Sequence, residues 1–235
     1  MTQMILDVDA LIFDKDGTLF DFGATWNTFG KRIITALAEG DPALEQRLAD
    51  ATHYDLTAQA YLPTSPVIAG TNREAVELIA PFLPHHTLDE LEKSLMQMTF
   101  EVPQIEVVPL RRYFERLHEM GKKIGVVTND TERGARVHLE RANCLTIADF
   151  VAGYDSGYGA KPAPDPLLAC ARSCGVDPTR CAMVGDSTHD LRAGRAAGMT
   201  TIGVLTGMAL REELVPFADL VLDDIGEIPA LLKVS

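Results

Sequence analysis

Four short segments of the chain carry polar residues in patterns that suit catalysis. The first, FDKDGTL (13–19), places Asp14 and Asp16 two residues apart after an apolar stretch, and Gly17 permits the sharp turn that follows. Two carboxylates in one crevice can divide a displacement reaction, because one attacks and the other moves protons. The pair is also a natural Mg²⁺ site. A solvated turn after a strand is the structural alternative.

The second segment, VVTND (126–130), carries Thr128 and Asn129 between an apolar stretch and a predicted helix. A hydroxyl group and free backbone N–H groups at a helix N-terminus form an anion-binding site. Thr, Asn and Asp are all favoured at ordinary helix N-caps, so capping is the alternative interpretation of this segment taken alone.

The third segment, GAKPAPDP (159–166), holds Lys161 on a stiff lead-in to the next helix. Pro162 keeps Lys161 out of helical geometry, and Pro166 suits the first turn of a helix. A lysine held in this way can neutralise a phosphoryl group as a point charge. A solvated surface lysine is the alternative.

The fourth segment, GDSTHDL (185–191), places Asp186 after another apolar stretch and Asp190 in the first turn of the following helix. Helix capping would explain both residues. They would also complete an open magnesium site with Asp14 and Asp16. All four segments fall at predicted strand ends, and together they supply what phosphoryl transfer requires: a cation site, a nucleophile, an acid/base, a hydroxyl and a lysine.

The segments that must position these residues alternate short strands with helices. Buried parallel strands are predicted over the apolar, often β-branched segments 10–14, 122–128, 148–153, 180–186 and 200–205. Helices are predicted over 110–120, 131–142 and 187–197. The alternation predicts an α/β fold with a doubly wound, Rossmann-like parallel sheet, in which ligands bind outside the carboxyl ends of the strands.

Residues 21–102 interrupt this alternation, because they contain several helical patterns and no convincing buried strand. We therefore predict an α/β catalytic core formed by residues 1–20 and 103–235. A helical cap domain of residues 21–102 is predicted as an insertion after the first strand.

Composition narrows the possible partners and location. The formal net charge of −13 disfavours nucleic acid and anionic membranes as partners. No apolar stretch approaches the roughly 18 residues needed to cross a bilayer, and the acidic start lacks the basic region of a secretory signal. A cytoplasmic location is expected. The four cysteines are interpreted as small buried apolar residues rather than zinc ligands.

With these segments in this order, the chain resembles the haloacid dehalogenase superfamily, and within it the phosphoglycolate-phosphatase-like branch with a helical cap. The resemblance implies a Mg²⁺-dependent phosphatase acting through an aspartyl-phosphate. Its substrate would be a small-molecule phosphate ester, such as phosphoglycolate or a short sugar phosphate. We expect a monomer or homodimer with no nucleic acid and no membrane partner.

The resemblance also assigns catalytic and metal roles. Asp14 would be the nucleophile and Asp16 the general acid/base. Mg²⁺ would be held by the Asp14 carboxylate, the Asp16 backbone carbonyl and the Asp186 carboxylate, with Gly17 supporting the turn. Lys15 is an uncommon residue for its position, and alternation along the chain predicts that it points away from the site.

Phosphate binding is assigned in the same way. The family pattern implies that Thr128 and Lys161 hold the phosphoryl oxygens and that Asn129 contributes through its backbone. Asp190 would orient Lys161 or a metal-bound water.

Three alternative functions stay open at this level. A sugar phosphomutase shares the nucleophile but returns the phosphoryl group to its substrate. A phospho-receiver or signalling module uses similar residues, but it is about half as long and needs no helical insertion. A catalytically silent phosphate-binding protein could use the same fold, since fold does not imply function.

Overall fold

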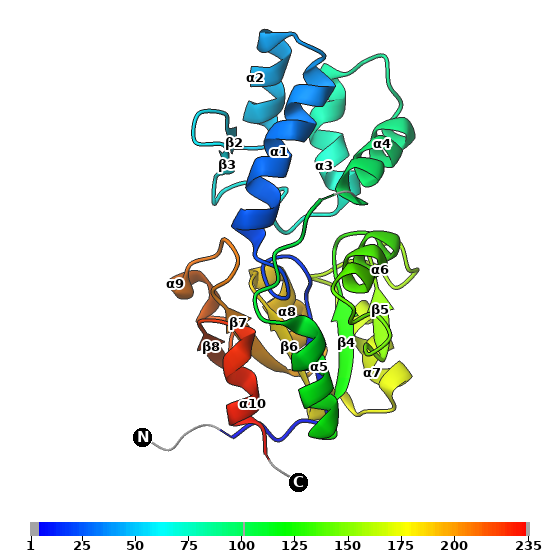
Figure 1. Ribbon diagram of the computed structural model, residues 1–235, viewed down its shortest axis with the longest axis vertical. Coiled ribbons are helices and arrows are strands. Elements are labelled where there is room, and N and C mark those ends of the chain that lie inside the picture. Colours follow the sequence, from blue (N-terminus) through cyan, green and yellow to red (C-terminus); the bar gives the residue numbers. More distant parts are fainter. Residues whose placement is uncertain (1–4, 101, 234–235) are drawn as a thin grey trace. The chain divides into compact units, whose positions relative to one another are not determined.

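The computed structural model describes residues 5–100 and 102–233 (Figure 1). The chain divides into two compact units, Met1–Asp21 with Glu106–Ser235, and the intervening Phe22–Ile105. The second unit begins one residue later and ends three residues later than the insertion expected at 21–102. Its role as a cap stays a prediction.

The first unit is built on one sheet of six parallel strands in the order β5-β4-β1-β6-β7-β8. The strands are β1 (Ala10–Phe13), β4 (Lys123–Val127), β5 (Phe150–Ala152), β6 (Cys181–Gly185), β7 (Thr200–Val204) and β8 (Leu220–Leu222). Because β1 pairs with both β4 and β6, the strand order reverses at β1, and ligands of doubly wound sheets bind at such a point. The predicted fold class is confirmed. Strand β8, which has three residues, was not predicted.

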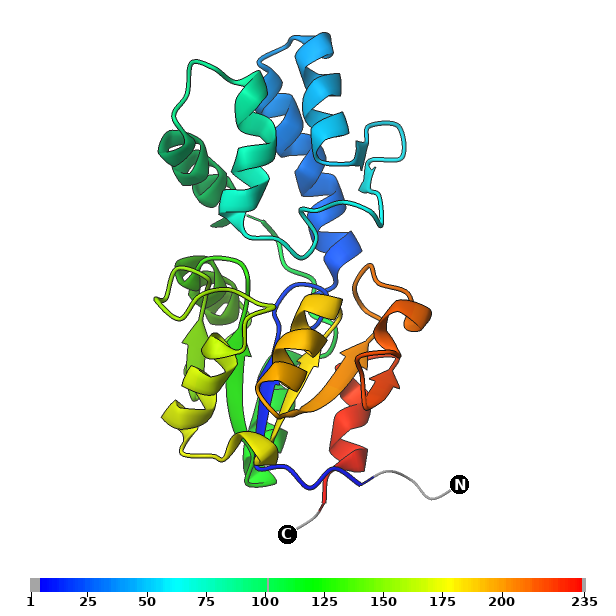
Figure 2. The same cartoon turned by 180° about the vertical axis from the view of Figure 1, so that it is seen from behind.

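Helices cover both faces of this sheet, and β1 alternates between them. Leu11 and Phe13 belong to one apolar cluster, and Ala10 and Ile12 to the other. The first cluster takes buried residues from α5 (Leu110–Glu119), α6 (Glu132–Arg141) and α10 (Ile228–Leu231). The second takes them from α7 (Asp165–Cys174) and α8 (Thr188–Ala196). Figures 1 and 2 show α5 and α10 on one face and α7 and α8 on the other.

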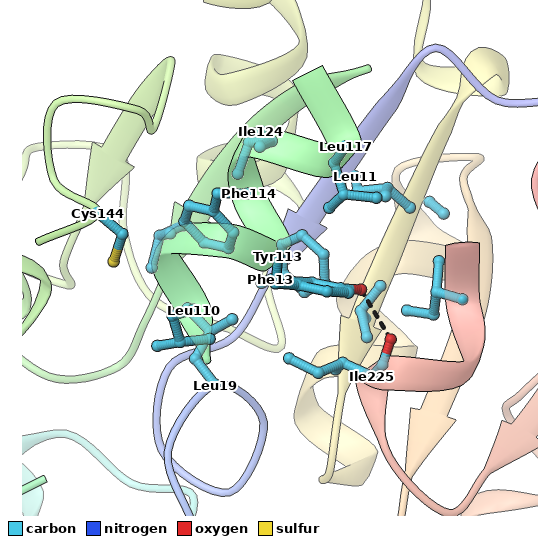
Figure 3. Packing of buried hydrophobic residues seen from close by; sticks show 14 of the residues in the cluster. Leu11, Phe13, Leu19, Leu110, Tyr113, Phe114, Leu117, Ile124, Cys144 and Ile225 are labelled. Atoms are coloured by element: carbon cyan, nitrogen blue, oxygen red, sulfur yellow. Dashed lines mark hydrogen bonds between the residues drawn. The ribbon is translucent and has the colours of Figure 1, made fainter. Parts of the chain in front are cut away.

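Aromatic packing holds the end of β1 directly before Asp14. The Phe13 ring stacks on Phe114 at 5.9 Å and meets the edge of Tyr113 at 6.0 Å. The Tyr113 hydroxyl donates a 2.8 Å hydrogen bond to the carbonyl of Ile225 (Figure 3). Such pairs stabilise a core beyond their buried area. The backbone that leads into Asp14 is therefore fixed by packing on α5.

The inserted unit contains α1 (Phe22–Ala38), α2 (Pro42–Ala51), α3 (Asn72–Ile79) and α4 (Leu88–Phe100). A small antiparallel hairpin joins β2 (Tyr54–Asp55) and β3 (Ala60–Tyr61). Only helices were predicted here, because two residues per strand leave no alternating pattern. Helix α3 begins with a capping box between Thr71 and Glu74.

The remaining elements are short. They are α9 (Arg211–Leu214) and 3-10 turns at Ala80–Phe82, Pro178–Arg180 and Ile225–Glu227. The four cysteines carry free thiols. Cys144, Cys170 and Cys181 are buried as expected, whereas Cys174, which was also expected to be buried, is only partly buried. In the part of the chain that the structure describes, no helix is long and apolar enough to cross a membrane.

Candidate active site

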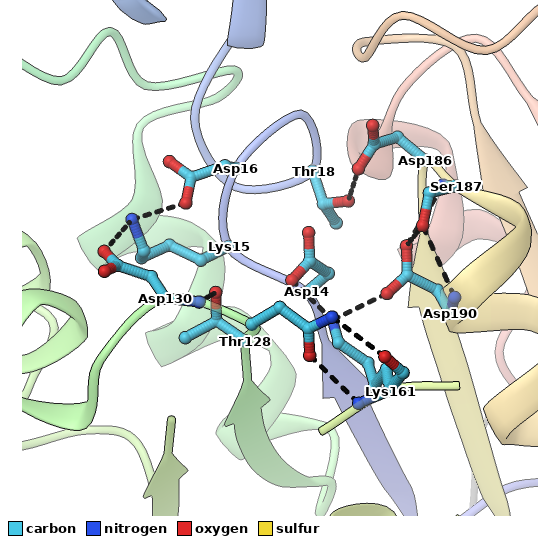
Figure 4. Close-up of polar contacts among 11 residues, drawn as sticks. Asp14, Lys15, Asp16, Thr18, Thr128, Asp130, Lys161, Asp186, Ser187 and Asp190 are labelled. Atoms are coloured by element: carbon cyan, nitrogen blue, oxygen red, sulfur yellow. Dashed lines mark hydrogen bonds and ion pairs between the residues drawn. The ribbon is translucent and has the colours of Figure 1, made fainter. Parts of the chain in front are cut away.

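Three neighbouring strands end at one edge of the sheet, and each is followed by a predicted site residue. Asp14 follows β1, Thr128 follows β4 and Asp186 follows β6. Phe13, the last residue of β1, is in register with Val126 and Val184, so the three strand ends lie side by side. Figure 4 shows the polar side chains gathered beyond these ends.

Lys161 links two of the predicted carboxylates. Its Nζ lies 2.6 Å from Asp14 Oδ1 and 2.6 Å from Asp190 Oδ1, and its side chain is almost fully buried. The Asn129 side chain holds the main chain of this lysine: Asn129 Nδ2 donates to the Lys161 carbonyl, and the Lys161 N–H donates to Asn129 Oδ1, both at 2.9 Å. Asn129 was expected to act through its backbone, and this side-chain contact was not predicted.

The two carboxylate oxygens of Asp190 make separate contacts, one with the start of α8 and one with Lys161. Its Oδ2 accepts hydrogen bonds from the Ser187 hydroxyl at 2.6 Å and the Ser187 N–H at 3.0 Å, which closes a capping box at the start of α8. Its other oxygen accepts from Lys161. The capping and functional interpretations of this residue therefore do not compete.

Asp186 is enclosed by backbone and by one hydroxyl. Thr18 Oγ1 donates to Asp186 Oδ1 at 3.1 Å. Gly17 has φ +83°, and a Cβ at this position would overlap the Asp186 carboxylate. A Cβ at Gly207 would overlap the same carboxylate. Gly17 is thus required for its backbone angle and for space. Gly207 lies in a segment distant in sequence from Asp186, so no local sequence pattern indicated this close approach.

Thr128 lies at the end of β4, and its hydroxyl oxygen accepts the N–H of Asp130 at 3.0 Å. The N-cap of α6 is Thr131, whose side chain accepts from the N–H of Gly134. Thr128 and Asn129 therefore lie before the helix cap, and simple N-capping does not account for them.

Asp16 is turned toward Lys15 (Figure 4). Lys15 Nζ lies 2.6 Å from Asp16 Oδ2 and 3.2 Å from Asp130 Oδ2, and it contacts His138 Nδ1 at 3.1 Å. Lys15 was expected to point away from the site, and with respect to Asp16 that expectation was wrong. The reason is that β1 ends at Phe13, so strand alternation no longer sets the direction of the side chain at position 15.

Comparison with known proteins identifies the family. The family model of the haloacid dehalogenase-like hydrolases matches residues 8–198 of the 235-residue chain. The chain belongs to this family.

This haloacid dehalogenase-like hydrolase is similar to named phosphatases along nearly its whole length. It is 35% identical over 239 residues to the probable phosphatase IndB of Dickeya dadantii, covering 96% of this chain and 95% of that protein. It is 27% identical over 243 residues to a phosphoglycolate phosphatase of Shigella boydii, covering 96% and 93%. A solved hydrolase of the family from Deinococcus radiodurans has a TM-score of 0.66 at 22% identity, covering 96% and 95%. The predicted family is confirmed, and so is the predicted class of enzyme, a phosphatase.

The buried carboxylates of the site, those of Asp14, Asp186 and Asp190, carry more negative charge than Lys161 balances. Burial raises the pKa of Asp14 to about 7, because Lys161 only partly offsets the loss of water and Asp190 adds repulsion. Burial, with repulsion from Asp14 and Asp190, also raises the pKa of Asp186 well above its ordinary value. Burial opposes the charge of Lys161, but its two carboxylate partners outweigh this and raise its pKa.

A hard divalent cation fits this cluster. Asp14, Asp186 and Asp190 each offer a carboxylate oxygen, and these atoms all lie within 4.8 Å of one another. Oxygen ligands suit Mg²⁺, and a bound cation would offset the burial and the carboxylate repulsion that raise the pKa values of Asp14 and Asp186. Both oxygens of Asp190 already accept hydrogen bonds, so Asp14 and Asp186 are the better-suited side chains. The Asp16 carboxylate lies apart with Lys15, consistent with a backbone role for Asp16 at the metal.

Proposed function

We propose that this hydrolase is a Mg²⁺-dependent phosphatase that acts on a small-molecule phosphomonoester through a phosphorylated Asp14. The observation that carries the proposal is the buried Asp14–Lys161 pair, 2.6 Å apart, at the end of the central strand where the strand order reverses. A carboxylate in this position can attack phosphorus, and the cation beside it can receive the phosphoryl oxygens.

The first half-reaction transfers the phosphoryl group to Asp14. A bond forms between an Asp14 oxygen and phosphorus while the bond to the leaving oxygen breaks, and Asp16 donates a proton to that oxygen. Lys161 and the Thr128 hydroxyl bind the phosphoryl oxygens. Asn129 keeps Lys161 in place through two 2.9 Å hydrogen bonds to its main chain.

The second half-reaction releases phosphate. Asp16 takes a proton from a water molecule that attacks phosphorus, and the bond to Asp14 breaks. Asp14 and Asp186, with the Asp16 carbonyl, would hold Mg²⁺. The bound ion would keep Asp14 ionised and neutralise the phosphoryl oxygens.

The relatives and the net charge support the proposed substrate class. One relative is named a phosphoglycolate phosphatase, which supports phosphoglycolate or a short sugar phosphate as the substrate. A net charge of −13 disfavours polyanions. We further propose that the inserted unit acts as a cap and restricts the size of the substrate.

Phosphate release from a panel of esters tests this function. We expect Mg²⁺-dependent release from phosphoglycolate or hexose phosphates, and far lower catalytic efficiency on a phosphopeptide. Chelator should remove the activity and added Mg²⁺ should restore it. An isomerised sugar phosphate without free phosphate would indicate a mutase, and full activity in chelator would contradict the metal site.

Thermal unfolding tests the metal site without turnover. The ordinary pKa of Asp14 is 3.8, and its folded value is about 7. The folded state therefore binds more protons between these values, and the stability of the metal-free protein should fall as pH rises from about 4 to 7. Mg²⁺ should offset this loss, so its stabilisation should be larger at pH 8 than at pH 5.5. At 100 times the dissociation constant the gain is about 2.7 kcal/mol.

The matched variants are Asp186→Asn and Asp223→Asn. The first removes a buried carboxylate from the cluster, so it should lose the response to Mg²⁺ while leaving the metal-free protein at least as stable. Asp223 is an exposed carboxylate of the same unit, with 83% of its side chain accessible, and its replacement should leave the response intact. Equal responses in both variants would argue against a metal at Asp186.

A further inference from the structure

Besides Lys161, the site contains the buried lysine Lys15, which contacts Asp16. The proposed reaction does not use Lys15. The Lys15 side chain is fully buried and lies 2.6 Å from Asp16 Oδ2. Among the described residues, Asp130 and His138 also offer acceptors to its ammonium group, at 3.2 and 3.1 Å. An ammonium group has three donors and no acceptor, so His138 accepts through an unprotonated Nδ1. Figure 4 shows Lys15 and Asp130 on a different side of Asp14 from Lys161.

Burying this lysine is costly unless its partners compensate. Removing an ammonium group from water costs several kcal/mol after relaxation. Burial opposes the charge of Lys15, but the Asp16 and Asp130 carboxylates outweigh it and raise its pKa above the ordinary value. An apolar side chain at this position would avoid the desolvation. The lysine therefore contributes the orientation of the groups that it holds rather than packing alone.

The partners of Lys15 are themselves fixed. The Thr131 N–H donates to Asp130 Oδ1 at 2.6 Å, and the other Asp130 oxygen faces Lys15. A Cβ at Gly134 would lie 2.8 Å from that oxygen, so α6 approaches it closely. The His138 ring packs edge-on against Phe20 at 6.5 Å. Lys15 is thus contacted by Asp130 from the loop after β4, which also carries Thr128, and by His138 from α6.

We propose that Lys15 is a positioning residue for Asp16. It binds one oxygen of the Asp16 carboxylate and so restricts the carboxyl group to the orientation from which it exchanges protons with the leaving oxygen and with water. Asp130 and His138 fix Lys15 in turn. The inference rests on the proposed acid/base role of Asp16.

The test is the dependence of rate on the leaving group, because kcat/KM reports the step in which that group departs. The alkyl phosphate in this test is whichever of phosphoglycolate and the hexose phosphates is hydrolysed faster, and its leaving oxygen requires protonation. 4-Nitrophenyl phosphate, in contrast, has a leaving group that is stable as an anion. Lys15→Met should lower kcat/KM on the alkyl phosphate by on the order of 10²-fold, and much less on 4-nitrophenyl phosphate. Adding Lys15→Met to Asp16→Asn should cause little further loss, because both changes disable the same group.

Two further variants keep the test decisive. Lys15→Met takes the cation away from the buried Asp130 carboxylate. The double variant Lys15→Met/Asp130→Asn removes both charges together and should show the same leaving-group dependence. It replaces the single variant in the test if Lys15→Met unfolds. Lys122→Met is the matched control, because Lys122 is also buried in this unit but donates to the Val8 carbonyl at 2.9 Å. It should reduce the rates on both esters equally, if at all.

The outcomes separate the two proposals. A wild-type protein that hydrolyses neither ester refutes the proposed function and this inference with it. An active wild type whose Lys15 variants lose both substrates equally, or whose loss is additive with Asp16→Asn, overturns the inference and leaves the proposed function standing.

Discussion

Asp14→Asn should lower kcat by on the order of 10⁶-fold, the loss typical of removing a catalytic nucleophile. An amide does not attack phosphorus at a useful rate. The fold should survive, because Lys161 keeps its 2.6 Å contact with Asp190. The burial that raises the pKa of Asp14 also means that its charge does not support the folded state. Phosphate release and thermal unfolding, measured on the same preparation, check both parts.

Chemical trapping identifies the phosphorylated residue directly. Acid-quenched wild-type protein should carry its phosphoryl group on a peptide that contains Asp14, and Asp14→Asn should carry none. Asp223→Asn, at an exposed carboxylate of the same unit, should be labelled like the wild type. Phosphate on His138 or Ser187 instead would refute the aspartyl-phosphate mechanism.

The parts of the site that were predictable from sequence are those set by strand ends. Buried parallel strands leave apolar runs, and their carboxyl ends meet at one edge of the sheet. The residues directly after these runs, Asp14, Thr128 and Asp186, could therefore be expected to lie together from residue patterns alone. Short strands such as β8 and the β2–β3 hairpin leave no comparable pattern, and they were not predicted.

Contacts made beyond the strand ends were not predictable in this way. Position 15 lies in the turn after β1, where alternation no longer indicates direction, and its partner His138 comes from a distant helix. The Asn129 side chain reaches a main chain 32 positions away. Gly207 approaches Asp186 only because the chain folds back after β7. Each contact depends on tertiary packing, which local residue patterns do not encode.

Lys161→Met should cost both activity and stability. The variant leaves Asp14 and Asp190 buried without the cation that lies 2.6 Å from each. Breaking a buried ion pair from one side costs about 3–5 kcal/mol of unfolding free energy. Without the ammonium group, the phosphoryl oxygens also lose an electrostatic partner, which should lower kcat/KM by about 10³-fold.

The pH dependence of that destabilisation distinguishes a charge effect from a packing effect. Lys161 lowers the pKa of Asp14, so in Lys161→Met this pKa should rise above about 7. At pH 5 Asp14 is then protonated and the missing cation matters less, whereas at pH 8 the unfolding free energy should fall furthest below wild type. Lys122→Met, which removes a buried lysine that donates to a backbone carbonyl, should lose similar stability at both pH values and keep its kcat/KM. A Lys161→Met protein with wild-type kcat/KM would show that this lysine does not bind the phosphoryl group.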